Sequence, residues 1–143
     1  MTMIRVIVLA VATLAPIVMV GCGGVDRDAY VLANARLFAG LPRLPGARLE
    51  SGVSTAYHAD ESGPVIGYGT RFELTLPMSA TRRSVSTFFR RRLESVGWRL
   101  VETLDAVFNF RRGKAFLSLN LENARVHMLE IAVDYSYYGK LTR

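Results

Sequence analysis

The chain has 143 residues and a formal net charge of +6. This length is enough for one domain with a modest core and too short for two domains. Its single cysteine excludes a disulfide within the chain, so the fold has to be held by packing. Eighteen lysines and arginines against twelve acidic residues suit an anionic partner.

The first 21 residues predict an export signal. One cation, Arg5, precedes an apolar run from Val6 to Val20, which is the layout of a secretory signal peptide. The run is shorter than the roughly 17–25 residues that a membrane-spanning helix needs. Export argues against nucleic acid as the partner and favours anionic lipid headgroups or envelope polymers.

The end of the apolar run carries the motif Met19-Val20-Gly21-Cys22. It resembles the lipobox of bacterial lipoproteins, although Met19 stands where leucine is usual. The resemblance implies cleavage between Gly21 and Cys22, a diacylglycerol on the Cys22 thiol, and a protein held on the extracytoplasmic side of a bacterial membrane. Two acyl chains anchor a protein stably, whereas one chain binds only marginally. The alternatives are an uncleaved anchor and secretion after cleavage elsewhere, and the motif does not choose between inner and outer membrane.

Residues 22–46 predict a tether, a helix and a linker. Gly23 and Gly24 form a flexible tether, and Asp26 is suited to cap a helix from Arg27 to Ala39. The apolar positions of this helix recur at helical spacing: Val31, Ala35 and Phe38. Two prolines at 42 and 45 then predict a linker, because neither continues a helix.

From residue 47 the hydrophobic period changes to two, which predicts strands. One strand covers Ala47 to Tyr57 with a bulge at Gly52, and a second runs from Tyr68 to Leu76. The turn at residues 60–64 joins them as a hairpin.

The clearest helix signal covers Arg82 to Val96. One face carries an apolar stripe, Val85, Phe89, Leu93 and Val96. Ser79 or Thr81 is suited to cap the start. Gly97 and Trp98 predict a Schellman motif at the end, with Trp98 contacting Leu93.

Four further strands follow, and the last runs from Leu129 to Tyr135. Their alternation predicts an antiparallel sheet with one buried and one solvated face. With the amphipathic helix on this sheet, residues 47–143 predict a single two-layer α+β domain of order ββαββββ, preceded by the N-terminal helix.

Three local motifs carry a second resemblance. Leu44-Pro45-Gly46-Ala47, the helix segment from Val85 to Leu93, and Gly97-Trp98 are together similar to a Pro-Gly-Ala…Phe-Tyr…Leu…Gly-Trp module of many uncharacterised bacterial envelope proteins, often lipoproteins. Phe89 stands where that module commonly has tyrosine. The motifs form a turn, a helix face and a helix cap, so the resemblance implies a fold and no chemistry.

Candidates for chemistry are few. His58 with Asp60 and Glu61 is one candidate set for a hydrolase-like enzyme or a cation site, and His127 with Glu130 is the other. No Gly-x-Ser-x-Gly context frames a serine, and no second cluster has the spacing of metal ligands. We therefore expect no catalytic residue, no metal and no cofactor.

The strongest local charge comes from four arginines on the main helix: Arg82, Arg83, Arg90 and Arg91. They predict either a solvated helix face or contact with an anionic surface. A small-ligand carrier on the open sheet face, in a cleft lined by Phe116 and Met128, is a further alternative. The sequence favours a lipid-anchored envelope protein with a non-enzymatic interaction or structural role, whose partners are the membrane and envelope proteins or anionic polymer.

Overall fold

A six-stranded antiparallel sheet with two α-helices makes up the part of the chain, residues 25–135, that the computed structural model describes. The elements in chain order are α1 (Arg27–Ala39), β1 (Arg48–His58), β2 (Val65–Thr75), α2 (Arg82–Ser95), β3 (Arg99–Leu104), β4 (Val107–Arg112), β5 (Ala115–Asn120), the short 3-10 helix η1 (Glu122–Val126) and β6 (Met128–Tyr135). The predicted α+β class with an antiparallel sheet is confirmed.

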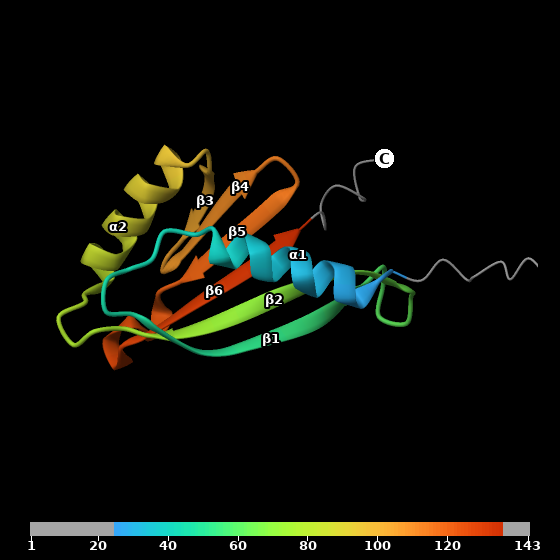
Figure 1. Ribbon diagram of the computed structural model, residues 1–143, viewed down its shortest axis with the longest axis horizontal. Helices are drawn as coiled ribbons and strands as arrows, with labels where there is room; N and C mark the ends of the chain where they lie inside the picture. The colour runs from blue at the N-terminus through green and yellow to red at the C-terminus, as the bar shows by residue number, and fades with distance from the viewer. Residues whose placement is uncertain (1–24, 136–143) are drawn as a thin grey trace, which may run out of the picture.

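The last strand occupies the middle of the sheet, whose order is β1-β2-β6-β5-β4-β3. The β1–β2 hairpin lies on one side of β6, and the β3–β4–β5 meander lies on the other (Figure 1). Strand β6 therefore joins two parts of the sheet that are each built from neighbouring segments.

Both helices cover the same face of the sheet. Phe38 of α1 stacks on Phe72 of β2 with ring centroids 3.8 Å apart, and Phe38 lines one cavity together with Phe89 of α2 and Ile131 of β6. The core lies between this helix layer and the alternate positions of the sheet, which include Phe72, Phe110, Leu117, Leu119, Leu129, Ile131 and Val133. The opposite face has no helix packed on it among the described elements.

Helix α2 has the start, face and end that its sequence predicts. Thr81, and not Ser79, is the N-cap: its hydroxyl accepts from the Ser84 N–H at 3.1 Å, and the Ser84 hydroxyl accepts from the Thr81 N–H in return. Val85, Phe89 and Leu93 are fully buried. Val96, predicted as the fourth residue of the stripe, is instead the C-cap and is 46% exposed, because the helix ends at Ser95.

The end of α2 is the predicted Schellman motif. The Trp98 N–H donates to the Leu93 carbonyl at 3.0 Å and the Gly97 N–H donates to that of Glu94 at 3.2 Å. Gly97 has φ +87°, which glycine adopts without the steric cost that a Cβ would bring.

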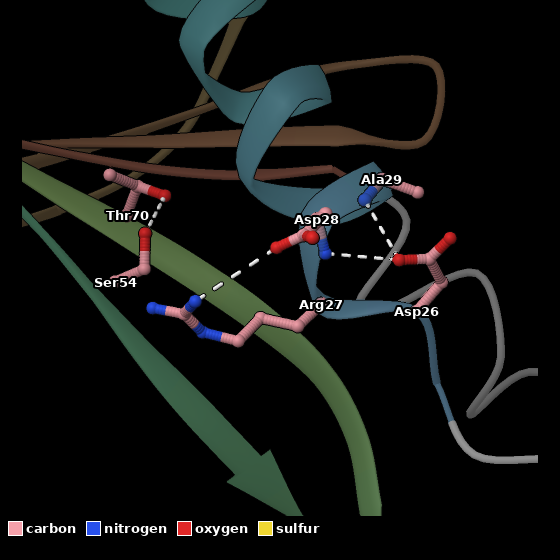
Figure 2. A network of polar contacts seen from close by, with 6 residues as sticks. All are labelled: Asp26, Arg27, Asp28, Ala29, Ser54 and Thr70. Carbon is pink, nitrogen blue, oxygen red and sulfur yellow. Dashed lines mark hydrogen bonds and ion pairs between the residues drawn. The ribbon is translucent and has the colours of Figure 1, made fainter.

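Helix α1 begins at Asp26, whose side chain accepts from the N–H groups of Asp28 and Ala29 (Figure 2). The face that it buries differs from the expected apolar stripe. Ala35 is exposed, and the fully buried residue of this helix is Asn34. Hydrogen bonds explain this burial, since a polar side chain can be buried cheaply only when its groups are paired.

The Asn34 amide bridges two strands. Its Nδ2 donates to the Tyr68 carbonyl at 2.8 Å and to the Thr70 hydroxyl at 3.2 Å, both on β2, and its Oδ1 accepts from the Tyr135 N–H of β6 at 2.9 Å. The Thr70 hydroxyl lies 2.8 Å from that of Ser54 on β1 (Figure 2). One side chain of α1 is therefore linked, directly or through Thr70, to three strands.

The predicted position of the bulge in β1 is wrong. The register with β2 shifts between Leu49 and Ser51, so Glu50 is the extra residue, and Gly52 lies in regular register opposite Phe72. The bulge reverses the alternation that follows it, so Val53 faces the uncovered side of the sheet and is 60% exposed. Gly52 has a packing role instead, since a Cβ there would lie 3.2 Å from the Phe72 ring.

We predict that Asn34→Ala destabilises the domain by at least about 2 kcal/mol, because it leaves buried polar groups of two strands unpaired and each such group costs about 1–3 kcal/mol. Urea unfolding measures the change. Leu32→Ala, at an exposed position of the same helix, is the control and should have little effect. Equal stabilities for the two variants would contradict the role given to Asn34.

Trp98 offers a second test of the core, because it is 1% exposed and the Arg112 guanidinium lies 4.8 Å from its ring centroid. Truncation to alanine should cost roughly 3–5 kcal/mol through lost burial and a cavity. Its indole nitrogen has no hydrogen-bond partner within the described residues, so Trp98→Phe should cost clearly less. Thermal melting compares both, and a Trp98→Ala midpoint within a few degrees of the wild type would show that this packing is wrong.

Candidate functional site

The expected lipidation and cleavage residues, Cys22 and Gly21, lie outside the residues that the structure describes. The described helices offer no segment that combines the length and the apolar character required to cross a bilayer. The described domain begins close behind the motif, since only Gly23 to Asp26 separate Cys22 from α1.

The first catalytic candidate, His58 with Asp60 and Glu61, lies in the exposed turn between β1 and β2. The His58 Nδ1 is 2.9 Å from the Gly63 carbonyl, and the Asp60 carboxylate accepts from the Ser62 N–H at 3.1 Å. These contacts fix the turn itself. Residues 25–135 contain no group of three histidine, cysteine or acidic side chains placed to hold a metal ion.

The second candidate pair, His127 and Glu130, is not brought together by any contact found among the described residues. His127 ends η1 in a left-handed conformation, φ 58°, and its carbonyl accepts from the Leu76 N–H at 2.7 Å. Glu130 forms an ion pair with Arg71 of β2 at 3.3 Å on the uncovered face. Glu130 therefore has a structural contact on the uncovered face, whereas His127 makes its contact through the backbone and its buried ring Nδ1 has no hydrogen-bond partner among the described residues.

The uncovered sheet face does not gather Phe116 and Met128 into one cleft. Phe116 is opposite Asp134 near the end of β6, whereas Met128 begins that strand. Asp134 and Met128 are six positions apart along β6, which corresponds to about 20 Å. The four hollows that we describe on residues 25–135 are lined by other residues.

The four arginines of α2 are all exposed. Arg83, Arg90 and Arg91 lie away from the buried stripe of the helix. Arg82 begins the helix on the side of Val85 and lines a hollow together with Asp105 and Glu122. Arg82 and Arg83 stand in the first turn, which has no acidic residue. Cations at a helix N-terminus oppose the helix dipole, at a cost of about 0.3–1 kcal/mol each. The ion pairs found among the described residues involve Arg27 and Arg71 instead, so no ion pair found there offsets this cost.

A second group of cations, which the sequence analysis missed, lies where β3 and β4 meet. Arg99 and Arg111 are directly opposite each other across the two strands, an arrangement of like charges that destabilises a sheet. Both line a shallow hollow together with Arg112. Their pairing depends on a register shift between Leu100 and Glu102, for which the sequence gives no local signal.

Helix α2, with its four arginines, and the start of the domain at α1 lie at different ends of the molecule. Figure 1 shows α2 at one end and the beginning of α1 at the other. The ring of Tyr30, near the start of α1, is 6.2 Å from that of Tyr68 in β2, which places the acidic β1–β2 turn toward the same end as the start of α1.

Comparisons of the chain with protein-family models, with curated proteins and with solved structures found no match. Function is therefore argued from the residues and their geometry.

Proposed function

We propose that the protein is a bacterial lipoprotein of the cell envelope, acylated at Cys22 and held on the extracytoplasmic side of a membrane. Its domain, a ββαββββ unit preceded by an N-terminal helix, serves a non-enzymatic interaction or structural role. The lipobox-like motif supports the anchor. The contacts of His58, Asp60 and Glu130 support the non-enzymatic role, because each of these groups is used in the fold.

The observation that carries the interaction role is the exposed arginine face of α2, which we define as Arg82, Arg83, Arg90 and Arg91. Two of these residues stand where the helix dipole disfavours them, and an anionic partner would offset that cost. Guanidinium groups bind carboxylates and phosphates with paired hydrogen bonds. The partner is thus an anionic polymer or protein of the envelope.

The distance of this face from the membrane anchor limits which anionic partners it can reach. The four residues from Gly23 to Asp26 reach no more than about 14 Å when extended, so the start of α1 stays near the anchoring membrane. Helix α2, which carries these arginines, lies at the far end of the molecule from that point (Figure 1). This arrangement favours a component away from the anchoring bilayer over the headgroups of that bilayer.

The anchor is tested by Cys22→Ala. We expect the variant to leave the membrane fraction or to accumulate as an uncleaved precursor, because the thiol that carries the lipid is gone. Cell fractionation and mass spectrometry of the mature N-terminus make the measurement. An unmodified Cys22 thiol in the mature wild-type protein would refute the lipoprotein assignment.

The arginine face is tested with a matched pair of double variants of the chain lacking residues 1–22. Arg90→Gln with Arg91→Gln should weaken sedimentation with insoluble anionic wall polymer, whereas Arg36→Gln with Arg48→Gln, which removes the same charge from other exposed positions, should not. Binding by the wild type should fall as salt rises, because exposed charges are screened over about 8 Å at physiological ionic strength. Equal losses in both variants would indicate a net-charge effect, and the arginine face would then have no specific role.

A further inference from the structure

The helix layer is incomplete between α1 and α2, and a cavity of about 240 Å³ lies there. Its wall comes from the end of α1, the linker that follows, the start of β1, and single residues of α2, β2 and β6. Representative wall residues are Phe38, Leu41, Ala47, Leu74, Phe89 and Ile131.

Contacts outside the cavity fix its walls. Phe38 is stacked on Phe72, and the ring of Phe72 in turn lies close to the Gly52 backbone. Leu41 is 7% exposed and Phe89 is 1% exposed, so both are already packed against other parts of the core. These three wall residues therefore cannot shift into the cavity without losing contacts elsewhere in the core.

The side chains of the wall are apolar except for that of Arg43, which is exposed. No acidic residue lines the cavity. Leu49, also in the wall, is 55% exposed, so the apolar interior is continuous with the surface. A mostly apolar hollow with one placed polar group is the usual form of a small-molecule site.

We infer that this cavity binds a monoanionic amphiphile, a single medium-length acyl chain with a carboxylate head. The chain lies among the apolar wall residues and the carboxylate pairs with Arg43. An apolar cavity of about 150 Å³ takes up benzene, so by proportion this one holds roughly eight to ten carbon atoms. The inference does not depend on the anchor or on the arginine face of α2, and each can fail without the other.

The test uses the full chain in phosphatidylcholine vesicles and a decanoate that carries a photoreactive diazirine. After irradiation, peptide mass spectrometry should find label concentrated between Phe38 and Leu49. Unlabelled decanoate should compete, and decyltrimethylammonium should not. Label spread over the chain without concentration at these residues would overturn the inference.

Two variants test separately the contribution of the apolar cavity and that of the Arg43 charge to binding. Ala47→Leu adds volume at the cavity wall and should abolish the concentrated label while raising the melting temperature, because it fills a void. Arg43→Gln should reduce decanoate labelling by up to about fivefold, the upper end of what loss of an exposed ion pair does, and leave labelling by the matching diazirine alcohol unchanged.

Arg48→Gln is the matched control, since Arg48 is exposed nearby and does not line the cavity, and it should label as the wild type does. Equal losses in Arg43→Gln and Arg48→Gln would show that Arg43 has no special role and would overturn the carboxylate assignment. Unchanged labelling in a folded Ala47→Leu variant would place the ligand elsewhere. Should Ala47→Leu fail to fold, Ala39→Leu, at another small wall residue, replaces it and is judged by the same criterion.

Discussion

The buried amide of Asn34 is the contact on which the arrangement of the sheet most depends. Its partners are two groups on β2 and one on β6, the two strands whose pairing joins the N-terminal hairpin to the C-terminal meander. Amide groups accept only a narrow range of donor and acceptor positions. A shift of β2 along β6 would break this set, so Asn34 specifies the register as well as the position of α1.

Local signals explain what the sequence predicts correctly. The cap, apolar stripe and end of α2 depend on residues within one or two turns of each other. Propensity and spacing are therefore enough to find Phe89 and Gly97 and to limit the cap to Ser79 or Thr81. The alternation of the strands in the meander is similarly local, and it predicts the antiparallel sheet.

What the sequence does not predict depends on distant partners. The burial of Asn34 has no local signal in the sequence, because its hydrogen-bond partners are 34 to 101 residues away. The bulge at Glu50 is set by the register with β2, and glycine at position 52 suggested it wrongly, since Gly52 instead admits the Phe72 ring. The cavity beside Arg43 likewise forms only when two helices, a linker and three strands meet, so composition alone gives no sign of it.

The central place of β6 has a consequence for how the protein is made. A chain that is threaded through a membrane channel must stay unfolded during passage, and this sheet cannot be completed until its final strand is present. Contacts between distant segments also form slowly. For the exported protein that we propose, the strand order therefore delays completion of the sheet until β6 has emerged, which favours an unfolded precursor during translocation.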